Sequence, residues 1–223
     1  MRDIEDKALI VLEKLKELYP EAKCELNFGN TFQLLVATVL SAQSTDKKVN
    51  EITAELFKQY RTPEDFLSMT QAELEEKIKK IGLYRNKAKN IIQMCQELIA
   101  RFGGEVPDNM EDLVSLPGVG RKTANVVLSN GFGIPAIAVD THVFRVSNRI
   151  GLAHSNNVDD TERQLMYSIP KDKWSLAHHL LIWHGRRICE ARKPKCDICP
   201  ITDDCDYFNK KSNKTANVIC KLK

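Results

Sequence analysis

Apolar residues recur along the first part of the chain at steps of three and four, which is the spacing of one helix face. At the N-terminus these positions are Ile4, Ala8, Val11, Leu15 and Leu18. The pattern predicts an amphipathic helix that ends at Pro20, because proline does not continue a helix. Residues 32–40 are apolar at nearly every position and predict a buried helix.

Polar caps and glycines mark further helices along the rest of the chain. Asp46 can cap a helix that runs to about Tyr60, and Gly103 stops another. The remaining predicted helices lie in a short segment from Thr62 and at residues 72–80, 87–102, 111–115, 120–129, 141–149, 159–168 and 172–184. Only residues 134–139 resemble a strand, and Pro135 weakens that interpretation. The chain is therefore predicted to be all-α.

Length and composition exclude several classes of protein. The 223 residues, 43% hydrophobic and 28% charged, are typical of a folded globular protein with one or two domains. No apolar stretch approaches the roughly 18 residues that span a bilayer. The N-terminus is too acidic and too poor in apolar residues for a secretory signal. These features predict a cytoplasmic protein.

Basic side chains gather in two places, although the net charge is only +3. Six lie between Lys77 and Lys89 with no acidic residue among them. The second group consists of Arg186, Arg187, Arg192, Lys193 and Lys195. Such patches suit a polyanion, since phosphate contacts are the largest sequence-independent part of DNA binding. Either patch taken alone is equally well explained as the solvated face of a helix.

Four cysteines near the C-terminus have the spacing C-x6-C-x2-C-x5-C. They are Cys189, Cys196, Cys199 and Cys205. Thiolates this dense in a reducing compartment indicate a metal centre. A cubane iron–sulfur cluster fits one irregular loop better than zinc, which usually takes two short knuckles; zinc and chance clustering remain alternatives. Metal binding by the cysteines would fix the basic loop between the first two of them, which can contact phosphate through Arg192, Lys193 and Lys195.

A glycine-rich turn follows the helix predicted at 111–115. Residues 117–120 read Pro-Gly-Val-Gly and predict a tight turn before a second helix. Glycine lets the backbone approach a ligand closely, and the N–H groups at a helix start bind anions. The expected phosphate-binding residues are Gly118, Val119, Gly120 and Arg121. A plain helix–helix turn is the alternative, but the following Arg-Lys pair and the cysteine group favour DNA.

Three motifs together resemble the endonuclease III family of helix-hairpin-helix DNA glycosylases. They are Leu-Pro-Gly-Val-Gly-Arg-Lys-Thr-Ala-Asn at 116–125, Val-Asp-Thr-His-Val at 139–143, and the four cysteines. The resemblance spans about residues 3–208, in the order and separations of the family.

The resemblance implies two all-α domains with DNA across the cleft between them. A six-helix barrel would span 23–134, with its helix-hairpin-helix at about 111–130. The cluster domain would combine residues 1–22 with 135–208. The tail at 209–223 is polar and basic, and we assign it no function.

Two residues match the catalytic positions of the family. Lys122 lies in the first turn of the second hairpin helix, where its amine can attack C1′ of a deoxyribose and form a Schiff base. Partial burial and the positive end of the helix would disfavour the ammonium form; a solvated surface lysine is the alternative. Asp140 can cap the helix that follows it, and its carboxylate can also stabilise positive charge on the sugar.

A flipped base leaves a hole in the duplex that the protein must fill. The family uses a glutamine and a leucine, which match Gln43 and Leu83. Gln43 offers a donor and an acceptor to the orphaned base, and Leu83 would wedge between bases. The alternatives are an ordinary polar loop residue and a core leucine.

The resemblance therefore implies a base excision repair enzyme that removes oxidised pyrimidines. A lysine Schiff base would then cleave the strand 3′ to the lesion by β-elimination. A [4Fe-4S] cluster is the implied cofactor, and damaged or abasic double-stranded DNA is the implied partner of a monomeric, nucleoid-associated protein. A monofunctional mismatch or adenine glycosylase is one alternative, although such relatives lack a lysine at the position of Lys122. A non-enzymatic DNA-binding iron–sulfur protein is another.

Overall fold

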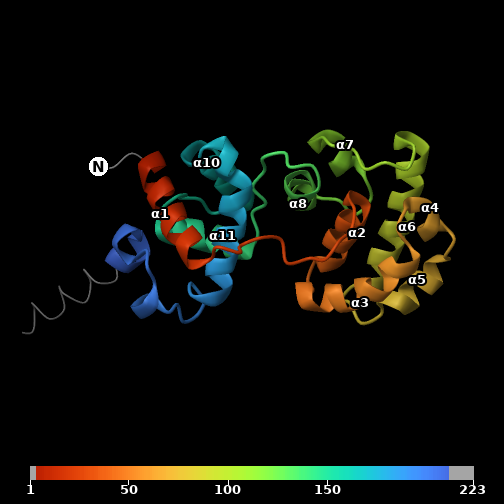
Figure 1. Ribbon diagram of the computed structural model, residues 1–223, viewed down its shortest axis with the longest axis horizontal. Coiled ribbons are helices and arrows are strands. Elements are labelled where there is room, and N and C mark those ends of the chain that lie inside the picture. Colours follow the sequence, from red (N-terminus) through yellow and green to blue (C-terminus); the bar gives the residue numbers. More distant parts are fainter. Residues whose placement is uncertain (1–3, 211–223) are drawn as a thin grey trace, which may run out of the picture. The chain divides into compact units, whose positions relative to one another are not determined.

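The computed structural model describes residues 4–210, and regular secondary structure in that range is entirely helical (Figure 1). The α-helices are α1 (Ile4–Leu18), α2 (Thr31–Ser41), α3 (Asp46–Gln59), α4 (Pro63–Leu67), α5 (Gln71–Ile78), α6 (Tyr84–Phe102), α7 (Met110–Ser115), α8 (Arg121–Gly131), α9 (Thr141–Ile150), α10 (Val158–Ser168) and α11 (Trp174–Arg187). The 3-10 helices are η1 (Lys171–Lys173), η2 (Cys196–Ile198) and η3 (Thr202–Asp204).

The all-α prediction is confirmed. The first helix ends at Leu18, before the proline that the sequence marks as its limit. The strand-like run at 134–139 forms no regular element and pairs with no strand in the described part of the chain. Most of the tail predicted at 209–223 lies outside the described residues.

Contacts divide the chain into two units, and each has its own core. We call Cys24–Ala136 the central unit. The terminal unit combines Met1–Lys23 with Ile137–Lys223, of which residues 4–23 and 137–210 are described. None of the described helices is long and apolar enough to cross a membrane.

Helix α2 forms the core of the central unit. Every residue from Phe32 to Leu40 is buried, including the polar Gln33 and Thr38, which confirms the buried helix predicted from the nearly continuous apolar run. It packs against α3, α6 and α8, so it needs apolar side chains on all faces. The side chain of Asn30 caps its N-terminus by accepting a hydrogen bond from the N–H of Gln33 at 2.8 Å. The carbonyls at its other end lie beside the loop that leads into α3.

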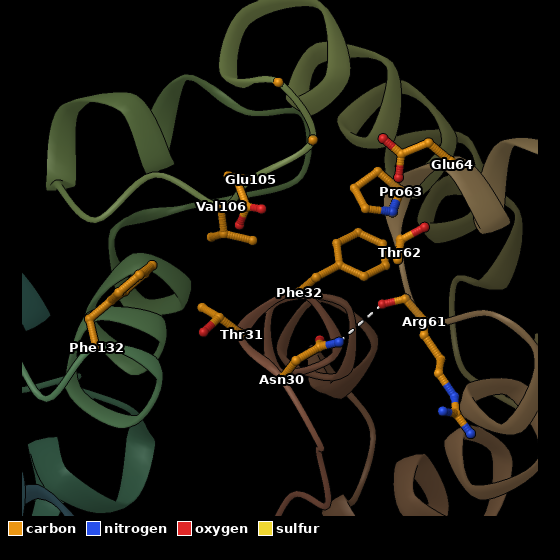
Figure 2. Close-up of a pocket in the computed structure, with 12 residues that line it drawn as sticks. Asn30, Thr31, Phe32, Arg61, Thr62, Pro63, Glu64, Glu105, Val106 and Phe132 are labelled. Carbon is orange, nitrogen blue, oxygen red and sulfur yellow. Dashed lines mark hydrogen bonds between the residues drawn. The ribbon is translucent and has the colours of Figure 1, made fainter.

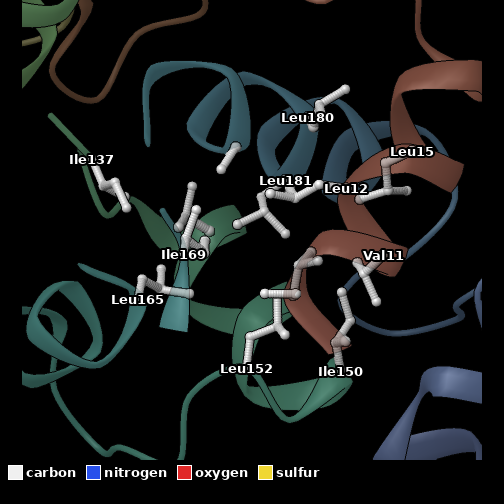
Figure 3. Close-up of a cluster of buried hydrophobic side chains, with 14 of the residues drawn as sticks. Val11, Leu12, Leu15, Ile137, Ile150, Leu152, Leu165, Ile169, Leu180 and Leu181 are labelled. Atoms are coloured by element: carbon white, nitrogen blue, oxygen red, sulfur yellow. The ribbon is translucent and has the colours of Figure 1, made fainter. Parts of the chain in front are cut away.

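The terminal unit is built on the packing of α9 against α11, with α1 against α10 and α11. Figure 3 shows apolar side chains from these helices meeting in one cluster. Among its fully buried members are Val11, Leu15, Val143, Val146, Leu165, Leu180 and Leu181. Complete burial of one such side chain contributes about 1.5–3 kcal/mol. This packing joins the N-terminal helix to residues more than a hundred positions later in the chain.

Candidate functional site

The glycine turn forms a hairpin between α7 and α8 in the central unit. Leu116 and Val119 are buried, and the N–H of Val119 donates to the Leu116 carbonyl at 3.1 Å. Gly118 has a φ of 78°, and a Cβ there would lie 2.9 Å from the Cβ of Asn90. Glycine is therefore required at Gly118 both by backbone conformation and by space.

The hairpin leaves the start of α8 open. Gly120 is its N-cap and offers no side-chain hydrogen bond, and a Cβ at that position would meet no atom within 4 Å. The first turn carries no acidic residue. N–H groups at a helix start and the positive end of the helix are the features that attract an anion, which supports the predicted phosphate contact. Because Val119 is buried, only its backbone can take part in that contact.

Lys122 lies in this first turn and is exposed. The sequence-based expectation that this side chain is partly buried is therefore wrong. The reason is its position at the helix start, where the chain leaves an exposed turn before α8 packs through Ala124 and the residues after it. Lys122 is free to reach a ligand bound at the hairpin.

Asp140 is the N-cap of α9 in the terminal unit, as the sequence predicts. Its Oδ1 accepts the backbone N–H groups of His142 and Val143, both at 2.8 Å. Neither of these two bonds uses Oδ2. The side chain is half-buried, so the carboxylate is held in a fixed orientation at an accessible helix start.

The four cysteines of the terminal unit line one cavity between α9, α11 and the loop that follows. Its other walls are mainly apolar and include Ile150, Ile188, Ile201 and Phe208. About 350 Å³ there is free of protein atoms, counting the open space at its mouth. All four thiols are free and half-buried. Four soft ligands around an apolar cavity fit a cubane iron–sulfur cluster.

Burial affects the cysteines before any metal binds. It raises the pKa of Cys199 to about 11 and also raises the pKa of Cys205, with smaller contributions from the neighbouring cysteines. The thiols of Cys199 and Cys205 are therefore protonated at neutral pH in the protein alone. Metal binding would displace these protons, because thiolates are the ligands.

Two basic side chains hold the cysteine loop from α9. The Nε of Arg145 donates to the carbonyl of Cys189 at 3.2 Å. Arg149 donates from Nη1 to the sulfur of Cys189 at 3.5 Å and to the carbonyl of Glu190 at 2.7 Å. Arg145 and Arg149 are four residues apart and so share one helix face. Their spacing could have indicated a common role, but nothing in the sequence shows what they contact.

A histidine of α11 lies beside one of the cysteines, Cys199. Nε2 of His184 lies 3.6 Å from the sulfur of Cys199, and its Nδ1 lies 3.3 Å from the hydroxyl of Tyr19. Burial lowers the pKa of His184 to about 4, so the ring is neutral at physiological pH. Sequence reasoning does not assign His184 to the metal centre, because its contacts depend on the packing of α1 against α11.

The predicted basic loop is exposed. Arg192, Lys193 and Lys195 all reach solvent between the first two cysteines. Lys195 is partly engaged, since its Nζ pairs with Glu190 at 2.7 Å and donates to the Arg187 carbonyl at 3.0 Å. The loop thus presents positive charge from a backbone that the arginines of α9 hold in place.

The residue predicted to meet the orphaned base, Gln43, and the predicted wedge, Leu83, both lie in the central unit. Gln43 is exposed in the loop between α2 and α3, and Leu83 precedes α6 with 56% of its surface exposed. This exposure rules out a core position for Leu83. Among residues 4–210 these are the two non-glycine residues with positive φ, at 55° and 57°. Strained backbone of this kind is concentrated at functional sites.

The central unit also has a pocket of about 310 Å³ near the start of α2 (Figure 2). It is lined by Asn30, Thr31, Phe32, Arg61, Thr62, Pro63, Glu64, Gly103, Gly104, Glu105, Val106 and Phe132. None of the residues predicted for DNA binding or catalysis lines it. The residues of the central unit that were predicted for DNA binding therefore lie in the hairpin and in two loops, outside this pocket.

Two family models match this chain. The model described as HhH-GPD superfamily base excision DNA repair protein matches residues 36–171. The model described as iron-sulfur binding domain of endonuclease III matches residues 189–205. The second range begins and ends at the outer cysteines of the predicted ligand set.

Relatives in bacteria and a solved complex are similar over nearly the whole chain. Endonuclease III of Bacillus subtilis is 50% identical over 204 residues, covering 91% of this chain and 93% of the relative. Endonuclease III of Escherichia coli is 48% identical over 204 residues, covering 92% and 97%. The structure of a trapped endonuclease III–DNA covalent intermediate matches with a TM-score of 0.88 at 48% identity, covering 93% of this chain and 98% of that one.

Proposed function

Since the chain belongs to the endonuclease III family of base excision DNA repair proteins, we propose that Lys122 and Asp140 carry its chemistry. The enzyme is a DNA N-glycosylase and abasic-site lyase that removes oxidised pyrimidines, and its cofactor is a [4Fe-4S] cluster. The alternative of a monofunctional glycosylase is not favoured, because Lys122 supplies the amine that the lyase step needs.

Lys122 acts as the nucleophile. Its uncharged Nζ attacks C1′ of the damaged nucleotide, and the bond to the base breaks with the electron pair leaving on the base. The ring of the sugar then opens to a Schiff base, and loss of a C2′ proton expels the 3′ phosphate by β-elimination. The observation that carries this proposal is the exposed position of Lys122 in the first turn of α8, next to the phosphate contact predicted for the hairpin. A relative has been trapped as a covalent intermediate with DNA, which such a nucleophile would form.

Asp140 supports the bond-breaking step. Two backbone N–H groups fix its Oδ1, so the carboxylate is oriented before substrate arrives. A carboxylate near C1′ stabilises the oxocarbenium-like charge that develops as the base leaves. It also favours loss of a proton from the attacking amine. Asp140 can stabilise the sugar and assist the amine while it caps α9, because the two capping hydrogen bonds go to Oδ1.

The substrate is damaged or abasic double-stranded DNA, bound by a monomer. The proposed backbone contacts come from Gly118, Val119, Gly120 and Arg121 in the hairpin and from Arg192, Lys193 and Lys195 in the basic loop. Gln43 faces the orphaned base, and Leu83 enters the base stack.

The proposed cluster ligands are Cys189, Cys196, Cys199 and Cys205. When bound, the cluster would cross-link the loop that carries the basic residues, which is a structural role. A cluster held by thiolates and a DNA substrate both support a cytoplasmic, nucleoid-associated protein.

The domain ranges follow from the same assignment. We propose a six-helix barrel domain at 23–134 with the helix-hairpin-helix at about 111–130. Residues 1–22 and 135–208 would form the cluster domain. Limited proteolysis that leaves these ranges as stable fragments would support the proposal, and cleavage within the barrel helices would argue against it.

Borohydride trapping on abasic duplex DNA tests the function. Wild-type protein should form a covalent adduct, and Lys122→Gln should form none. Lys58→Gln, which alters an exposed lysine at the far end of α3, is the matched control and should trap normally. On a second duplex that still carries an oxidised pyrimidine, a monofunctional glycosylase would release the base without forming an adduct. A non-enzymatic protein would neither release the base nor form an adduct on either duplex. Trapping that survives in Lys122→Gln would overturn the lysine assignment.

A further inference from the structure

Lys87 is a buried lysine in the first turn of α6. Only 5% of its surface is exposed, and burial lowers the pKa of its amine. Its Nζ donates to the Leu40 carbonyl at 2.8 Å and to the Ala42 carbonyl at 2.5 Å. It also lies 3.4 Å from the Ser44 hydroxyl. All three acceptors are neutral, so stability alone is a poor explanation for a charge at this position.

The acceptors of Lys87 surround Gln43. Leu40 belongs to the last turn of α2, whose final carbonyls have no partner within the helix. Ala42 and Ser44 are the neighbours of Gln43 in the chain. Gln43 itself has a φ of 55°, a conformation that an L-residue keeps only when its surroundings hold it there. The Lys87 side chain supplies that support from a second helix.

The backbone of Lys87 holds the other strained residue. Its N–H donates to the Leu83 carbonyl at 3.0 Å, and Leu83 has a φ of 57°. The two segments also lie close together, since a Cβ added to Gly82 would lie 3.4 Å from the Gln43 carbonyl oxygen. One residue therefore bonds to both exposed segments, through its ammonium group on one side and its amide on the other.

We propose that Lys87 is a positioning residue that holds Gln43 and Leu83 at a fixed separation for the DNA duplex. The inference rests on the roles proposed above for these two residues. When a base leaves the stack, Gln43 has to meet the orphaned base while Leu83 enters the gap. A displacement of about 1 Å can cost roughly 100-fold in rate when it disturbs such an arrangement. Lys87 acts through its neighbours and takes no part in the chemistry.

The test compares two substrates under single-turnover conditions with Lys87→Met, which keeps the length of the side chain and removes its donors. One substrate is a duplex with 5-hydroxyuracil opposite guanine. The other is the same duplex with a one-nucleotide gap opposite the lesion, so that no orphaned base exists. Lys87→Met should slow excision roughly tenfold on the full duplex and less than about twofold on the gapped one. A general loss of folding would slow both equally.

Two further variants separate positioning from stability. Ile91→Val shortens a fully buried side chain one turn further along α6 and serves as the matched core control. It should leave the ratio of the two rates unchanged. Gln43→Ala should show the same substrate dependence as Lys87→Met, and the double variant should be no slower than Gln43→Ala alone. If Lys87→Met does not accumulate as folded protein, Lys87→Gln, which is too short to reach both carbonyls, replaces it under the same criteria.

Equal slowing on both substrates, or additive losses in the double variant, would overturn the inference. A Gln43→Ala protein with wild-type rates on the full duplex would overturn it together with the role of Gln43. The proposed function would survive either result as long as Lys122 still forms the borohydride adduct. Failure of the adduct in wild-type protein would instead remove the function on which the inference rests.

Discussion

Replacing Asp140 with asparagine separates two properties of one side chain. Its Oδ1 accepts the N–H groups of His142 and Val143 at 2.8 Å and so caps α9. The amide oxygen of asparagine has the same shape and can accept both hydrogen bonds, but the side chain carries no charge. Asp140→Asn should therefore keep the cap and lose the proposed catalytic carboxylate. Asp140→Ala should lose both.

The stability difference can be estimated from the cap. Replacing a capping side chain by alanine costs about 0.5–2 kcal/mol, whereas asparagine caps about as well as aspartate. Loss of the negative charge at the helix start adds about 0.3–1 kcal/mol to both variants. At about 2–4 °C per kcal/mol for a chain of this size, Asp140→Asn should lower the Tm by no more than about 4 °C. Asp140→Ala should lower it further.

The activity difference should be much larger than the stability difference. Single-turnover excision of an oxidised pyrimidine should slow by about 10²–10⁴ in both Asp140 variants, the range expected for loss of a general acid–base group. The Tm of the same protein preparations, measured by thermal unfolding, gives the stability loss with which the loss of excision rate is compared. If Asp140→Asn excises the base within about threefold of the wild-type rate, the carboxylate has no catalytic role and only the cap remains. Equal Tm losses in the two variants would contradict the capping argument.

Other predictions follow from the hairpin, the basic loop and a partly buried histidine. Gly118→Ala should destabilise the protein by about 1–3 kcal/mol in denaturant unfolding, because it combines left-handed backbone with a 2.9 Å contact to Asn90; Gly133→Ala, with a φ of 68° and no such contact, should cost less. Equal losses would show that the Asn90 contact is unimportant. Arg192→Ala should weaken binding to all duplexes alike and reduce the salt slope of log Kd by about 1, and an unchanged slope would exclude a phosphate contact. Burial lowers the pKa of His179 to about 3, so the unfolded chain binds the proton more tightly than the folded chain does. The stability that the neutral ring contributes is therefore fully present above pH 6.5, the pKa of the unfolded chain, and is lost as the pH falls toward 3. His179→Gln should flatten the fall of unfolding free energy below pH 6.5, and an unaltered pH profile would contradict this.

Local patterns predicted those parts of the molecule that depend on neighbours in the sequence. The helix at Ile4–Leu18, the buried helix α2 and the hairpin before α8 follow from spacing, glycine and proline. The capping role of Asp140 also follows, because a cap needs only the next three residues. The observed positions of these elements agree with the positions predicted from the sequence.

Other features depend on packing between distant segments, and the sequence does not show them. The exposure of Lys122 depends on which turn of α8 first meets the core, and its expected partial burial was wrong. The contact of Arg149 with Cys189 joins residues 40 positions apart. The buried Lys87 lies in the basic run of 77–89, where charge patterning treats every lysine alike. Only the folded chain distinguishes it from its solvated neighbours.

The position of the covalent bond to DNA tests the central claim most directly. Wild-type protein is trapped with borohydride on an abasic duplex, digested with a protease and analysed by mass spectrometry. The account predicts that the reduced sugar adduct lies on Lys122, within the peptide that begins the helix Arg121–Gly131. An adduct on any other lysine or on the N-terminal amine, with Lys122 unmodified, would contradict it.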